Sequence, residues 1–243
     1  DLTITELAKL ISGKNKNNDE FNYSSFPLHR KRTDWLKFEL FKKWTKFNYN
    51  FSCSGLENID FNENYIFTPN HESHFDSMWM MAFFPKKMQV RMCSMAADYL
   101  FRKSIYKYGV RIMGGVPVHR NGNTSIAMKR IYDLIAFENR SLMIHPEGTR
   151  SRNGQLGEFK IGAAELSIKT KIKIIPVGIN GARDIFPPDK KFPKLRTIGE
   201  KKRLHFAFGT PLDPLNYSNA RELTREIKKE IIKSVSYTHL TLP

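Results

Sequence analysis

Short apolar segments alternate with amphipathic helical patterns along most of this 243-residue chain, and this alternation limits its fold more than any other feature. A strand, a helix and a second strand in sequence form a parallel pair, because the helix carries the chain back across the sheet. We therefore expect an α/β fold with a mostly parallel sheet flanked by helices. The expected strands are 65–68, 90–94, 116–119, 141–145, 173–177 and 204–208, and the expected helices are 76–84, 98–108, 125–137, 161–169 and 220–234.

A histidine and an aspartate lie just beyond the first of these segments, in the sequence NHESHFD. In parallel α/β sheets, chemistry collects in the loops that follow the strands. A neutral imidazole at His71 can take a proton from an alcohol near physiological pH. A carboxylate at Asp76 can fix its tautomer and stabilise the imidazolium that forms. We interpret His71 as a general base with Asp76 as its partner; the alternative is a surface loop with a structural histidine.

Two further motifs end in, or contain, an arginine after a short apolar strand. GGVPVHR ends at Arg120, and HPEGTRS contains Arg150. Arginine can bind a phosphate through paired hydrogen bonds. Gly148 allows close backbone approach, so neighbouring N–H groups can form an anion site, and Glu147 can orient Arg150 or accept a hydroxyl. Alone, the first motif is weak, because strand-end arginines are common and mostly solvated, and the second is more often a turn than a site. A fourth segment, 174–179, is apolar and indicates a buried strand.

The positive charge of the chain requires an anionic partner. Its formal net charge is +16, which nucleic acid, an anionic bilayer or a phosphorylated substrate could each complement. A helix expected over 33–47 places Leu36, Leu40, Trp44 and Phe47 on one side and several lysines on the other. Two interpretations stay open for it: an anchor in the membrane interface, or a helix packed on the domain with a solvated basic face. The longest uncharged apolar stretch, 77–85, is too short to cross a bilayer.

The two ends of the sequence differ in character from the middle. Residues 1–25 indicate a short helix followed by a polar linker, and this segment could be the end of an upstream domain. We expect residues 26–234 to form one domain. The last nine residues, 235–243 (VSYTHLTLP), can be back-translated to a sequence that resembles a sequencing adapter. We expect them to be a non-native tail.

The four motifs, in this order, resemble those of the 1-acyl-glycerol-3-phosphate (lysophosphatidic acid) acyltransferase family, within the glycerolipid acyltransferase superfamily. The matching residues are Asn70, His71 and Asp76, then Gly114 and Arg120, then 146–151 (PEGTRS), then 175–177 (IPV), and the resemblance covers about 60–215. It implies a mostly parallel α/β acyltransferase domain over 26–234. It also implies a basic, amphipathic N-terminal helical element that holds the protein peripherally on the cytoplasmic face of an anionic membrane, without a transmembrane span.

The resemblance further implies transfer of a fatty acyl group from acyl-CoA or acyl carrier protein to a lysophospholipid, chiefly 1-acyl-glycerol-3-phosphate, with no metal or other cofactor. His71 would be the base and Asp76 its partner. The acceptor's glycerol phosphate would be held by Arg120, Glu147, Gly148, Thr149 and Arg150. Pro176 and Val177 would form a wall for the acyl chain, although a plain core strand is the alternative. One departure is Pro117, Val118 and His119, where family members usually have bulky apolar residues.

Three other functions stay open. The acceptor could be another lysolipid, such as a lyso-ornithine lipid. A metal-dependent hydrolase could use His71, His74, Asp76 and His145, although their spacing matches no zinc motif. A non-catalytic module could bind nucleic acid or anionic lipid through the basic segment 188–203. No helix-turn-helix, zinc-finger or RNP-type pattern is present in the sequence, so no nucleic-acid partner is expected.

Overall fold

The computed structural model describes residues 22–27, 33–102, 104–119, 124–151, 153–196 and 200–240, without the side chains of 104, 105 and 236–240. The helix expected over 1–12, most of the polar linker and Arg120 lie outside these residues.

A seven-stranded sheet forms the centre of the protein, in the order β1-β7-β6-β2-β5-β3-β4. Neighbouring strands are parallel except for β6 and β7, which run antiparallel. The expected mostly parallel α/β sheet is therefore confirmed. The strands are β1 (Asn50–Ser54), β2 (Ile66–Pro69), β3 (Met92–Ala97), β4 (Gly115–Val118), β5 (Ser141–Met143), β6 (Ile174–Asn180) and β7 (Arg203–Phe208).

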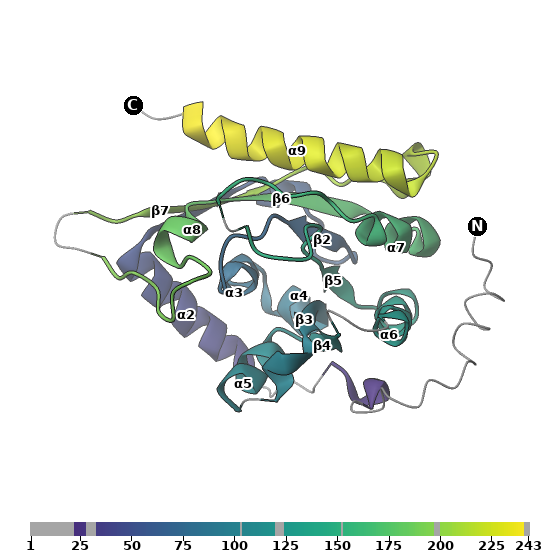
Figure 1. Ribbon diagram of the computed structural model, residues 1–243, viewed down its shortest axis with the longest axis horizontal. Coiled ribbons are helices and arrows are strands. Elements are labelled where there is room, and N and C mark those ends of the chain that lie inside the picture. Colours follow the sequence, from purple (N-terminus) through teal and green to yellow (C-terminus); the bar gives the residue numbers. More distant parts are fainter. Residues whose placement is uncertain are drawn as a thin grey trace.

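Helices cover both faces of the sheet (Figure 1). One face packs against α6 (Ser125–Ala136), α7 (Gly162–Thr170) and α9 (Ala220–Leu240). The other face packs against α2 (Asp34–Asn48), α3 (Asp76–Met81), α4 (Lys86–Arg91) and α8 (Ala182–Ile185). Beside β4 lies α5 (Ser104–Ile112), and the 3₁₀ helices are η1 (Tyr23–Ser25), η2 (Leu56–Asn58), η3 (Asp98–Phe101) and η4 (Pro214–Asn216).

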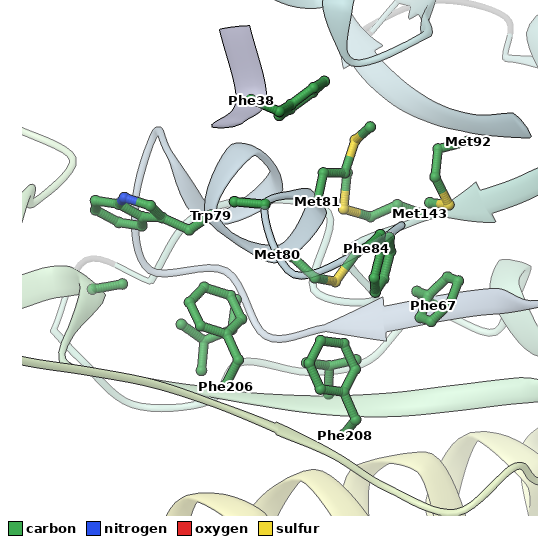
Figure 2. Close-up of a cluster of buried hydrophobic side chains, with 14 of the residues drawn as sticks. Phe38, Phe67, Trp79, Met80, Met81, Phe84, Met92, Met143, Phe206 and Phe208 are labelled. Carbon is green, nitrogen blue, oxygen red and sulfur yellow. The ribbon is translucent and has the colours of Figure 1, made fainter. Parts of the chain in front are cut away.

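The alternation of side chains along each strand divides the core into two clusters. In β2, Ile66 faces α6, α7 and α9, whereas Phe67 faces α2, α3 and α4. Because both faces are covered, the central strands β2, β5 and β6 are mostly apolar and almost fully buried. Figure 2 shows the cluster that contains Phe67. In it, side chains of α3 lie between Phe38 of α2 and the two phenylalanines of β7, Phe206 and Phe208. This packing fixes α3, whose first residue is Asp76, against the sheet.

Some element boundaries differ from the sequence expectations. The edge strand β1 was not predicted, since its sequence NFSCS mixes polar and apolar residues and it pairs only with β7. The strand expected at 90–94 begins at Met92, because α4 continues to Arg91. The helix expected over 98–108 is divided into η3 and α5. Helix α9 continues past Ser234 to Leu240; the non-native origin of 235–243 stays a prediction.

The helix expected over 33–47 is present as α2, but its core-facing side differs from the apolar row in the sequence. Phe38 and Thr45 are buried, while Leu36, Leu40 and Phe47 are 48%, 58% and 63% exposed. Polar contacts allow this orientation: Thr45 Oγ1 donates to the carbonyl of Phe41, four residues earlier. The helix therefore packs on the domain and also presents an apolar row to the surroundings.

A buried ion pair fixes the N-terminal end of α2. Asp34 is 2% exposed and accepts two hydrogen bonds from the guanidinium of Arg111 in α5, at 2.9 and 3.3 Å. Paired, bidentate contacts of this kind are among the stronger charge-assisted hydrogen bonds. The orientation of α2, and hence of its exposed apolar row, is thus set by contacts with the body of the domain.

Candidate active site

The loop between β2 and α3 begins at the C-terminal end of a central strand, between β5 and β6. Asn70 closes the strand: its side-chain amide accepts from the N–H of Ile179 at 2.6 Å and donates to the carbonyl of Ile179 at 3.1 Å. Both bonds are buried, so they fix the point at which the loop leaves the sheet. Sequence reasoning assigned no role to this asparagine.

His71 and Asp76 form the pair expected from their spacing. The His71 Nδ1 and Asp76 Oδ2 atoms are 2.9 Å apart, and the Asp76 side chain is fully buried. The same oxygen accepts from the backbone N–H groups of Glu72 at 2.7 Å and Ser73 at 2.8 Å. The loop is therefore wrapped around the carboxylate. With Nδ1 donating to Asp76, Nε2 of the neutral ring becomes the nitrogen that can accept a proton.

Burial changes the proton affinity of two carboxyl groups in this loop. It raises the pKa of Asp76 to about 6, against the opposite effect of the N–H groups of Ser73 and Glu72. It also raises the pKa of Glu72 to about 8, and the negative charge of Asp76 adds to this increase. Glu72 is therefore mostly protonated at neutral pH.

The HPEGTRS loop holds the backbone of His71 from the neighbouring strand β5. Glu147 is 6% exposed; its Oε1 accepts from the His71 N–H and its Oε2 from the Gly157 N–H, both at 2.9 Å. The N–H of Ser151 donates to the His71 carbonyl at 2.7 Å. Glu147 was expected to orient Arg150 or to contact the acceptor. Its observed partners are backbone groups, and contact with a substrate stays a prediction.

An open cavity of about 520 Å³ is lined in part by this loop. Its wall includes Glu147, Thr149 and Arg150, three of the residues predicted to bind the acceptor, and also Ser151, Asn153, Gln155, Gly157, Glu158, Phe159 and Lys160. Arg150 lies next to the His71 loop, because its Nη1 is 2.7 Å from Nδ1 of His74. Burial and the charge of Arg150 together lower the pKa of His74. The histidine loop and the arginine loop therefore meet at this edge of the sheet.

Lys160 is a second cation of the cavity wall, and sequence reasoning missed it. Gly148 has a left-handed backbone (φ +68°), and a β-carbon there would lie 2.9 Å from Nζ of Lys160. The absence of a side chain on Gly148 thus lets the lysine lie against the PEGTR backbone. The signal in the sequence was weak, because a lone lysine nine positions beyond the end of the motif does not indicate that the chain returns to Gly148.

The remaining predicted site residues are Pro176, Val177 and Arg120. Pro176 and Val177 belong to β6, opposite Thr68 and Pro69 of β2. Both are buried, and Val177 is part of the core beneath α3, as the core-strand alternative expected. Contact with an acyl chain stays a prediction. Arg120 lies outside the described residues.

The side chains proposed for the metal-hydrolase alternative have other partners. His145 Nδ1 lies 3.1 and 3.2 Å from the carbonyls of Pro69 and Asn70, and its Nε2 lies 3.3 Å from Ser77 Oγ. Among the described residues, no group of three or more His, Cys, Asp or Glu side chains could hold a metal ion.

Several known proteins are similar to this chain. A 1-acyl-sn-glycerol-3-phosphate acyltransferase of Streptococcus pneumoniae is 29% identical over 62% of the chain and 51% of its own length. The human 1-acyl-sn-glycerol-3-phosphate acyltransferase beta is 31% identical over a region that covers 52% of this chain and 45% of the human protein. The chloroplastic 1-acyl-sn-glycerol-3-phosphate acyltransferase LPAT1 of Arabidopsis thaliana is 29% identical over a region that covers 57% of this chain and 38% of LPAT1. The chain thus spans about half the length, or less, of these curated relatives.

A solved structure and a family model extend this comparison. The crystal structure of the 1-acyl-sn-glycerophosphate (LPA) acyltransferase PlsC from Thermotoga maritima matches with a TM-score of 0.70, covering 89% of this chain and 86% of that one. At 20% identity, this likeness shows a shared fold. The family model described as Acyltransferase matches residues 50–180, a range that contains the His71–Asp76 pair and the whole PEGTRS loop. This chain belongs to the acyltransferase family.

Proposed function

We propose that the protein transfers a fatty acyl group from a thioester donor to the free hydroxyl of 1-acyl-glycerol-3-phosphate, giving phosphatidic acid. The observation that carries the proposal is the pair of a partly exposed His71 and a buried Asp76, which is joined through Glu147 to the loop whose cavity contains Arg150 and Lys160. A general base next to two cations suits an acceptor with both a hydroxyl and a phosphate. Acyl-CoA or acyl carrier protein is the co-substrate.

His71 acts as the base in a direct transfer. Its Nε2 takes the proton of the acceptor hydroxyl as that oxygen attacks the thioester carbonyl carbon. The tetrahedral intermediate then breaks its C–S bond, and the leaving thiolate takes the proton from the imidazolium. Asp76 keeps Nδ1 protonated throughout and stabilises the transient positive charge of the ring. General-base assistance of this kind contributes about 10²–10⁴-fold to the rate.

The cavity beside the base holds the acceptor in place. Arg150 provides a planar pair of donors for phosphate oxygens, and Lys160 provides a compact charge over the Gly148 backbone. Thr149 adds a hydroxyl donor, and Arg120 is expected to join them. Holding both substrates together removes much of the entropic barrier to their reaction. A phosphate-bearing acceptor is favoured over a lyso-ornithine lipid because the latter has no phosphate for these cations.

We also propose that the protein associates peripherally with the cytoplasmic side of an anionic membrane through α2. The exposed side chains of Leu36, Leu40 and Phe47 lie with Lys43 and Lys46 on the outer side of this helix. Apolar insertion and attraction of lysines to anionic lipids act together in such helices. The opposite side of α2 reaches the active-site loop, since the rings of Phe41 and Phe75 are 5.6 Å apart. Among the described helices, none is long and apolar enough to cross a bilayer.

The role of His71 is tested by an acyl-transfer assay with lysophosphatidic acid. We expect His71→Ala to reduce kcat by about 10²–10⁴-fold, because the attacking hydroxyl loses its base. In the wild-type protein, turnover should fall as the pH drops through about 6, because the His71–Asp76 pair then takes up a proton and the neutral base is lost. His205→Ala, on β7, is the matched histidine control. Normal turnover in His71→Ala would remove this residue from the mechanism.

Substitution of the two cations tests the phosphate assignment. We expect Arg150→Met or Lys160→Met to raise KM for lysophosphatidic acid about 10- to 100-fold, since each removes a charge-assisted contact. KM for the acyl donor should change little. Lys169→Met, an exposed lysine of α7, is the control. The assignment would be contradicted if only KM for the acyl donor changed. It would also be contradicted if activity with a phosphate-free lysolipid fell as much as activity with lysophosphatidic acid.

Vesicle binding tests the membrane assignment of α2. We expect the double change Leu40→Glu and Phe47→Glu to weaken binding to phosphatidylglycerol-containing vesicles about tenfold or more, because two apolar side chains no longer enter the interface. Phe137→Glu replaces a still more exposed aromatic residue directly after α6 and serves as the control. Equal binding by both variants would show that another surface meets the membrane.

A further inference from the structure

The ring of His145 lies flat against the ring of His71. Their centroids are 3.8 Å apart and their planes differ by 14°. His145 follows β5, which is hydrogen-bonded to β2, the strand that precedes His71. The proposed base therefore has two supports: a carboxylate at the edge of its ring and a second imidazole against its face. Phosphate binding by the PEGTRS loop does not explain why the ring of His145 is stacked on the ring of His71.

Hydrogen bonds fix the second ring as a neutral tautomer. Nδ1 faces the carbonyl oxygens of Pro69 and Asn70, so it carries a proton and donates it. Nε2 faces the hydroxyl of Ser77 and accepts from it. Both nitrogens are thus satisfied without a positive charge. Burial lowers the pKa of His145 to about 3, and the neighbouring His71 adds to this decrease. The ring stays neutral over the pH range in which an acyltransferase of this type would work.

We propose that His145 is a positioning residue: its neutral ring face keeps the His71 imidazole aligned with Asp76 and stabilises the imidazolium that forms during acyl transfer. This inference rests on the proposed function of His71. A cation within about 6 Å of an aromatic face is attracted to it. A neutral ring at this position can therefore favour the protonated form of His71, whereas a second positive charge would repel it.

The stack should affect turnover more than binding. His71 becomes positively charged only as it takes the proton of the attacking hydroxyl, so this contact is stronger in the transition state than in the ground state. Interactions of that kind raise kcat without lowering KM. His145 is poorly suited to be a second base, because a nitrogen with so low a pKa takes up few protons near neutrality.

Two substitutions of His145 separate the ring from its hydrogen bonds. His145→Phe keeps an aromatic face but cannot donate to Pro69 or Asn70, whereas His145→Gln keeps a donor but has no ring. Ser77→Ala removes only the partner of Nε2 and serves as the control. Each full-length variant is checked for folding by circular dichroism. Its kcat, KM for lysophosphatidic acid and pH profile of kcat/KM are then measured.

We expect His145→Gln to lose about tenfold in kcat, with KM changed less than about threefold. The acidic limb of its pH profile should also move to lower pH, because the charged form of His71 has lost a stabilising contact. His145→Phe and Ser77→Ala should stay within about threefold of the wild type in kcat. A purely structural role of His145 would not move the acidic limb in this way.

Three results would overturn the inference: normal kcat in His145→Gln, a loss in His145→Phe as large as in His145→Gln, or an unmoved acidic limb. If His145→Gln does not fold, His145→Leu replaces it with the same expectations. The proposed function is tested separately by His71→Ala. Normal turnover in His71→Ala would reject His71 as the base. If His71→Ala loses turnover but His145→Gln does not, only the proposed role of the stacked His145 ring is rejected.

Discussion

The carboxylate of Asp76 lies in the protein interior, where its Oδ2 accepts hydrogen bonds from two backbone N–H groups and faces Nδ1 of His71. A buried carboxylate is costly unless it is paired and hydrogen-bonded. The loop from Asn70 to Phe75 supplies those partners by wrapping around it. One interaction therefore shapes the loop and orients the ring of His71, the proposed base. Desolvation also raises the pKa of the partly buried Glu72, and the negative charge of Asp76 adds to this increase.

The neighbouring loop after β5 completes this arrangement from the other side. Its residues contact three parts of His71: His145 meets the ring face, Glu147 accepts from the N–H, and Ser151 donates to the carbonyl. The PEGTRS loop thus positions His71, the proposed base, and also forms part of the wall of the cavity that contains Arg150 and Lys160. Because β2 and β5 are adjacent parallel strands, both loops emerge at the same edge of the sheet. A shift in either strand would move the base relative to the proposed phosphate site.

The sequence was sufficient for the sheet type and for the histidine–aspartate pair, because both depend on local spacing. It was insufficient where the outcome depends on tertiary contacts. The apolar row of α2 left the orientation of the helix open: Trp44 packs on the core, but Leu36, Leu40 and Phe47 are exposed, because Thr45 satisfies its hydroxyl within the helix and packs inward. The His145 stack and the approach of Lys160 to Gly148 join residues of different loops. Neither follows from periodicity or motif spacing.

The tautomer of His71 is the central claim, and ¹⁵N NMR of histidine-labelled protein near pH 7.5 measures it most directly. The account predicts that Nδ1 of His71 carries the proton while Nε2 does not, and that Asp76→Asn changes both nitrogen shifts. A proton on Nε2 of the wild-type ring, or His71 signals that do not respond to Asp76→Asn, would contradict it.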